Sequence, residues 1–84
     1  MKVSVTEALR MVAMRANKSL AQLSKEITKA TPAAFVNMVA RGSMKMSVGA
    51  SFGEQCGYVL MFVPIDQKDA IVDGIEIKGE VEVE

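Results

Sequence analysis

Apolar residues recur every three or four positions in the first third of the chain, which is the spacing of one buried helical face. Two helix starts are marked by capping boxes, in which a serine is followed three residues later by Glu or Gln: Ser4 with Glu7, and Ser19 with Gln22. We therefore predict a helix after Ser4 and a second, short helix after Ser19 that ends near Thr28. The predicted inner faces consist of Val5, Leu9, Val12 and Ala16, then Leu20, Leu23 and Ile27.

A third helix is marked at both ends. Thr31 followed by Pro32 favours a helix start, because threonine caps free N–H groups and proline at the first position has no N–H to leave unpaired. Gly42 directly after Arg41 is typical of a helix end. About three residues separate this helix from the preceding one, which is the spacing of a helix-turn-helix. Its predicted buried residues are Phe35, Met38 and Val39.

A fourth, weaker helix is predicted from about Ser47 to Gln55. Gly49 and Gly53 lie inside it, and each costs about 1 kcal/mol relative to alanine, so packing must hold this helix together. Gly57 is expected to end it. The predicted inner face consists of Val48, Phe52 and Cys56.

The C-terminal third has strand patterns. The run from Tyr58 to Val63 is apolar at every position, so we expect a strand buried on both faces or covered by a partner. Residues from Pro64 to Lys68 are predicted to form a loop. From Ile75 onward apolar and charged residues alternate, which predicts a half-exposed strand. Its apolar face consists of Ile75, Ile77, Val81 and Val83, and its polar face of Glu76, Lys78, Glu80, Glu82 and Glu84.

These patterns predict one domain of mostly α, α+β class. Residues 1–57 are expected to form four to five short helices that include the helix-turn-helix. Residues 58–84 are expected to form an antiparallel β-hairpin or small sheet of the same domain, which joins two subunits. The length of 84 residues is near the lower end of what folds around a single core.

The net charge of zero conceals a strong segregation of charge along the chain. Residues 1–46 carry eight basic and two acidic side chains, a net charge of +6, and residues 47–84 carry the opposite, −6. A basic half attracts polyanions and an acidic half repels them. We therefore expect the protein to approach DNA with its helical half; the alternative is two ordinary solvated surfaces.

The residue types give little support to catalysis or to cofactor binding. The chain has no histidine, and its single cysteine, Cys56, has no second thiol for a disulfide or a metal site. No phosphate-binding glycine loop is present. No apolar run approaches the ~20 residues of a membrane span, and the N-terminus lacks the pattern of a signal peptide. We expect a cytoplasmic binding protein with no enzymatic activity, metal or cofactor.

The stretch from Val5 to Asp66 resembles the Cro/CI-type (XRE-like) helix-turn-helix family of phages and bacterial mobile elements. The residues that carry the resemblance are Ser19 to Leu23, Thr31 to Asn37, Arg41 to Ser43 and Gly57 to Pro64. The resemblance implies a lambda-repressor-like fold and a repressor-type transcriptional regulator that binds double-stranded DNA as a homodimer. The helix at about residues 31–41 would be the recognition helix.

The chain departs from the family at the residues that read bases. Leu20 replaces a glutamine that often contacts phosphate, and Ala33 and Ala34 replace polar residues early in the recognition helix. Alanine can touch a thymine methyl group but makes no bidentate base contact. Asn37 remains to bond adenine or phosphate, unless it is a solvated surface amide. The candidate DNA-binding residues are Ser19, Lys29, Thr31, Ala33, Ala34, Asn37, Arg41 and Lys45.

Three functions remain open at this point. The first is a homodimeric DNA-binding regulator, favoured by the basic helical half. The second is a protein-binding helix-turn-helix module, such as a phage-encoded inhibitor or accessory factor, favoured by Ala33 and Ala34. The third is an antitoxin whose acidic C-terminal strand binds a basic toxin.

Overall fold

The structure, a computed structural model, describes residues 2–28 and 31–79. It is mostly helical, as predicted. The elements in chain order are β1 (Lys2–Val3), α1 (Val5–Arg15), α2 (Leu20–Ile27), α3 (Pro32–Arg41), α4 (Met46–Gln55), the 3₁₀ helix η1 (Ile65–Ala70) and β2 (Glu76–Ile77).

The first three α-helices begin at the residues that the capping patterns predicted. The side-chain oxygens of Ser4, Ser19 and Thr31 each accept a hydrogen bond from a backbone N–H three residues later, at 3.1, 3.1 and 3.2 Å. These bonds satisfy one of the N–H groups that a helix start leaves free. Gly42 ends α3 with a φ of +63°, a left-handed conformation that glycine adopts at little cost.

The core lies where the four α-helices meet. Its fully buried side chains include Phe35 and Val39 of α3, Leu23 of α2 and Phe52 of α4. The rings of Phe35 and Phe52 are stacked, with centroids 5.9 Å apart and planes inclined by 4°. Each of α1 and α2 contacts both α3 and α4. Three of the four predicted inner residues of α1 pack against this core: Leu9, Val12 and Ala16.

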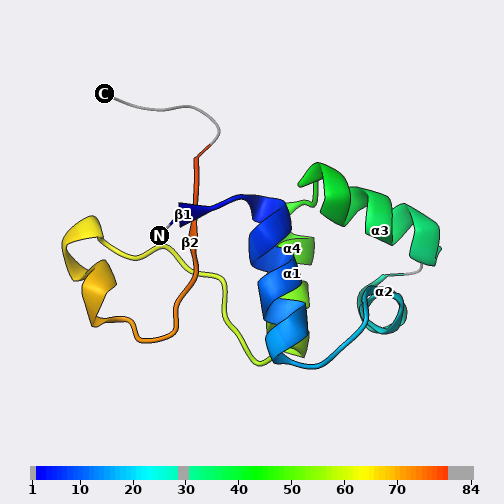
Figure 1. The fold of residues 1–84 in the computed structure, drawn as a ribbon, viewed down its shortest axis with the longest axis horizontal. Coiled ribbons are helices and arrows are strands. Elements are labelled where there is room, and N and C mark those ends of the chain that lie inside the picture. Colours follow the sequence, from blue (N-terminus) through cyan, green and yellow to red (C-terminus); the bar gives the residue numbers. More distant parts are fainter. Residues whose placement is uncertain (1, 29–30, 80–84) are drawn as a thin grey trace.

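The helices α2 and α3 contact each other and cross: Figure 1 views α2 along its axis, whereas α3 lies across the picture. Residues 29–30, which link them, lie outside the described residues. The prediction of a helix-turn-helix therefore concerns a connection that the structure does not describe, and it stays a prediction.

The C-terminal third corrects the sequence prediction in three respects. Tyr58 to Val63 forms no strand, and most of its apolar side chains are exposed rather than buried. The predicted loop from Pro64 to Lys68 instead contains the start of η1. The predicted strand from Ile75 onward is reduced to β2 within the described residues, while Val81 and Val83 lie outside them.

The sheet is also different from the predicted antiparallel hairpin. Strand β2 pairs in parallel with β1, with Lys2 opposite Glu76 and Val3 opposite Ile77. No sequence pattern predicted β1, which is only two residues long. Because β1 occupies the partner position of β2, the 58–63 segment has no strand beside it in the part of the chain that is described.

Figure 1 shows how the parts are arranged. The pair α1 and α4 lies in the middle, α2 and α3 lie on one side, and the C-terminal segment from η1 to β2 lies on the other. The acidic part of the described chain is therefore at the opposite end of the molecule from α3. Within residues 2–28 and 31–79, no helix has the length and apolar character that a membrane crossing requires.

Candidate functional site

Helix α3 has one buried face and one exposed face. Phe35 and Val39, four residues apart, are completely buried. Positions on the opposite side of the helix point into solvent, because 3.6 residues complete each turn. The exposed residues of α3 are Pro32, Ala33, Ala34, Val36, Asn37, Ala40 and Arg41. Below, the α3 face means these seven residues.

The C-terminal end of α3 is tied to α1 by a side chain that the sequence analysis missed. The Thr6 hydroxyl donates a hydrogen bond of 2.6 Å to the carbonyl of Val39, and it lies 3.3 Å from the carbonyl of Ala40. Carbonyls in the last turn of a helix otherwise lack partners. The contact spans more than thirty residues of sequence, so no local pattern reveals it. It orients the α3 face relative to α1.

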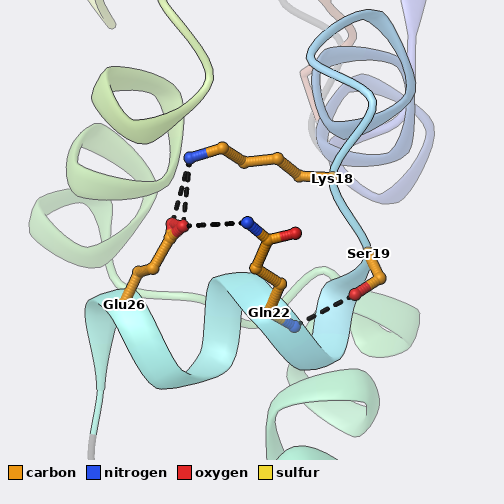
Figure 2. A network of polar contacts seen from close by, with 4 residues as sticks. All are labelled: Lys18, Ser19, Gln22 and Glu26. Carbon is orange, nitrogen blue, oxygen red and sulfur yellow. Dashed lines mark hydrogen bonds and ion pairs between the residues drawn. The ribbon is translucent and has the colours of Figure 1, made fainter.

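A small polar network holds the start of α2 (Figure 2). The Lys18 ammonium lies 3.0 Å from both carboxylate oxygens of Glu26, and the Gln22 amide lies 3.5 Å from one of them. These side chains reach across one face of α2, while the Ser19 oxygen accepts from the Gln22 N–H at its start. Lys18 is thus neutralised by a carboxylate of its own domain.

Five other cations have no such neutralisation. The following side chains form no hydrogen bond or ion pair with any residue that the structure describes: Arg10, Lys25, Arg41, Lys45 and Lys78. All five are exposed. Arg41 is the last residue of α3, and Lys45 directly precedes α4. Free cations therefore stand at the end of the α3 face and directly after it.

The structure brings most of the predicted DNA-binding residues together. Ala33, Ala34, Asn37 and Arg41 share the α3 face, at helical spacings of three and four residues. Thr31 caps the same helix, and Lys45 follows it across a short turn. Ser19 caps α2. Lys29 lies outside the described residues.

The α3 face is more apolar than a typical nucleic-acid contact surface. Besides Asn37 and Arg41, its members are alanines, one proline and Val36, which is 39% exposed. The face presents one amide and one guanidinium as hydrogen-bonding groups. Chemically it can donate to a phosphate or a base edge, and it can make apolar contacts; it holds no group that could act as a general acid or base.

A second set of contacts attaches the C-terminal segment to α1. The Arg15 guanidinium donates hydrogen bonds to the Tyr58 hydroxyl at 2.9 Å and to the carbonyl of Asp73 at 3.0 Å. It also lies 5.9 Å from the centre of the Tyr58 ring. The hydrogen bond that Arg15 donates to the Tyr58 hydroxyl raises the pKa of Arg15 further, so this group stays charged. Arg15 is therefore engaged in the fold.

Two other ionisable groups, Glu76 and Cys56, have a shifted pKa that follows from contacts within the fold. The hydrogen bond from Lys68 lowers the pKa of the Glu76 carboxyl, and Lys2 lies 3.8 Å away on the paired strand. Burial raises the pKa of the Cys56 thiol, which makes it a poor nucleophile. No group of three or more His, Cys, Asp or Glu side chains converges on a metal position in the described part of the chain.

Comparison with known proteins finds no match to this chain among protein-family models, curated proteins or solved structures.

Proposed function

We propose that this chain is a DNA-binding regulator that lays the α3 face in the major groove and binds as a homodimer. The observation that carries the proposal is the presence of Asn37 and Arg41 on one exposed helix face that Thr6 anchors, with Lys45 beside it. Within residues 2–28 and 31–79, no carboxylate pairs with either cation. The resemblance to Cro/CI-type regulators supports the same reading, because their recognition helix occupies the corresponding stretch.

Each residue has a distinct role in this proposal. Arg41 and Lys45 bind phosphates, which position the protein without reading sequence. Asn37 donates to and accepts from adenine in the major groove, the bidentate pairing that its amide allows. Ala33 and Ala34 contact thymine methyl groups. The Ser19 end of α2 approaches the DNA backbone with its N–H groups.

Charge also favours this orientation. The helical half carries a net charge of +6 and the C-terminal half −6. The acidic segment from η1 to β2 lies on the opposite side of α1 and α4 from α3 (Figure 1). A polyanion is therefore attracted to the α3 end and repelled from the other. Because Asn37 is the one side chain of the α3 face whose amide can hydrogen-bond to a base edge, most of the affinity comes from phosphate contacts.

The experiment is a gel-shift titration over salt with two duplexes, one from the region upstream of the protein's own gene and one unrelated. We expect binding to both at low salt, with log affinity falling linearly with log salt concentration. Arg41→Gln and Lys45→Gln should each reduce that slope by about one, equally for both duplexes. Lys68→Gln is the matched control, because Lys68 is paired with Glu76 in the C-terminal segment.

Asn37 is tested by its effect on preference rather than on affinity. Asn37→Ala should reduce the preference for the upstream duplex and leave binding to the unrelated duplex nearly unchanged. The loss of one bidentate contact corresponds to about 1–3 kcal/mol of discrimination. Absence of binding at about 50 mM salt, or binding that salt does not weaken, would contradict the proposal.

One observation favours a second candidate, a protein-binding module. The α3 face carries alanine at three positions and Val36 beside them, a surface that suits an apolar helix or strand of another protein. In that case Ala34→Glu would abolish capture of the partner protein, while Arg41→Gln would have little effect. The DNA titration separates the two candidates, because only the regulator requires a salt-dependent slope.

A further inference from the structure

The segment that follows α4 leaves most of its apolar surface in solvent. Phe62 is 88% exposed and Met61 is 63% exposed. Two hollows of about 400 and 300 Å³ lie against this segment, and both are lined by Met61 and Phe62. One extends to Ile71 beyond η1, and the other to Met46 on α4. Because they share two residues, the hollows belong to one continuous surface, here called the 59–63 surface.

The backbone of this segment lacks hydrogen-bond partners within the described residues. The N–H of Tyr58 donates to the carbonyl of Gly53, and the carbonyl of Pro64 accepts from Gln67. Between these two bonds, the N–H and C=O groups of residues 59–63 pair with no other group in the described chain. The segment therefore offers five residues of unpaired backbone, and unpaired N–H and C=O groups in a row readily pair with another chain.

The exposed apolar area is large for a chain of this size. Six large side chains of the surface are at least 44% exposed, and they are Met46, Val59, Leu60, Met61, Phe62 and Ile71. At on the order of 100 Å² each they expose roughly 600 Å², the upper end of the largest patch on a typical monomer. A standard interface takes about 800 Å² from each partner. The 59–63 surface is thus close to what a stable dimer requires.

We propose that the 59–63 surface binds a second copy of this chain, by antiparallel pairing of residues 59–63 about a two-fold axis at Met61. This register pairs Leu60 with the Phe62 side chain of the second copy on one face, an aliphatic–aromatic pair of the kind that stabilises sheets. It pairs Val59 with Val63 on the other face. Gly57 and Pro64 bound the paired stretch, since Pro64 has no N–H to donate.

Charge identifies a second copy as the occupant. The ten residues from Cys56 to Ile65 contain no charged side chain, although the rest of the C-terminal half is strongly acidic. A copy of the same segment therefore meets its partner without like-charge repulsion at the seam. A symmetric interface of this kind uses the same patch on both subunits. The inference rests on the homodimer of the proposed function and not on its DNA contacts, because the surface lies outside the α3 face.

The interface differs from one built on the alternating residues after Ile75. Within the described residues, β2 is already paired with β1, so its edge toward β1 is occupied. The 59–63 segment has both a free edge and a free apolar face. The structure therefore assigns the subunit contact to the segment directly after α4.

The first test measures the mass of the full chain by light scattering without DNA, over a series of protein concentrations. We expect twice the chain mass of 9.1 kDa for the wild type and the single-chain mass for Phe62→Glu. Met14→Glu is the matched control, because Met14 is 73% exposed on α1 and lines neither hollow; it should stay dimeric. Circular dichroism checks that each variant is folded.

A wild type that is monomeric at every concentration overturns the second copy as occupant and leaves the surface to a different protein. A dimer that persists in Phe62→Glu overturns the location. Because mass is measured without DNA, either failure is distinct from failure of the gel-shift titration.

The second test addresses the register. In the proposed pairing the two copies of residue 61 face each other at about 4.5–5.5 Å between Cα atoms, within disulfide range. The two copies of residue 59 are about 13 Å apart along the strands. Oxidised Met61→Cys should therefore run as a covalent dimer on a non-reducing gel and Val59→Cys as a monomer. Equal crosslinking of both variants, or of neither, overturns the antiparallel register.

Discussion

Phe35 is the residue whose removal most directly tests the helical core. Its side chain is completely buried, and its ring is stacked on Phe52 with centroids 5.9 Å apart. Phe35→Ala removes the ring and leaves a cavity between α3 and α4. Substitutions of this kind cost about 3–5 kcal/mol. The stacking geometry, worth about 0.5–1.5 kcal/mol beyond the buried area, places this site in the upper part of that range.

The expected loss is a large share of the total stability. At roughly 0.05–0.15 kcal/mol per residue, a chain of this length has a free energy of unfolding of about 4–13 kcal/mol. With a urea m-value near ~1 kcal/mol/M, the low end for small proteins, the variant should lose about 3–5 M of unfolding midpoint or fail to fold. Urea titration followed by circular dichroism at the helical band measures this directly.

Val36→Ala provides the matched control. Val36 is the next residue on the same helix and is 39% exposed, so its truncation should cost below about 1 kcal/mol. A Phe35→Ala variant that unfolds cooperatively within about 1 kcal/mol of the wild type would refute the assignment of Phe35 to the core. It would also refute the orientation of the α3 face, since the two faces of one helix are defined together.

Three further predictions address other elements. Gly42→Ala should destabilise the fold by about 1 kcal/mol because of its positive φ, whereas Gly49→Ala, inside α4 with open space at its Cβ position, should stabilise it by up to about 1 kcal/mol; urea midpoints that move the same way for both would contradict this. Cys56 should react with iodoacetamide more slowly in the folded protein than in urea, because burial raises its pKa; equal rates would refute the burial. Since Lys68 lowers the pKa of Glu76, the ion pair stabilises the fold above the ordinary pKa of about 4.3 and loses its effect as pH falls through the lowered value. A small, salt-sensitive loss of stability in Glu76→Gln at pH 7 should therefore vanish near pH 2, and a loss that is independent of pH would show another cause.

The helix boundaries could be predicted because their causes are local. A capping bond joins residues three positions apart, so Ser4, Ser19 and Thr31 carry their signal in adjacent sequence. The same holds for Gly42, whose left-handed φ follows from the absence of a side chain. The start of α4 was predicted one residue late, at Ser47 instead of Met46, because no side chain caps this helix.

The candidate site was predictable to the same extent. Helical periodicity alone places Ala33, Asn37 and Arg41 on one face, opposite Phe35. It does not reveal which cations are free. That Lys18 is paired with Glu26, and Arg15 with Tyr58, depends on how helices and segments meet in three dimensions.

By itself, the sequence determined four helices, the side-chain caps of the first three and most of the apolar residues that pack in the core, because these follow from contacts within a few residues. Only the tertiary structure decided which of the predicted strands form. A strand exists only where another backbone pairs with it, and β2 pairs with β1, some seventy residues away in the sequence. The 58–63 run has the composition of a strand but has no partner within the described residues. The apolar residues of this run, which the sequence predicted to be buried in a strand, are therefore mostly exposed.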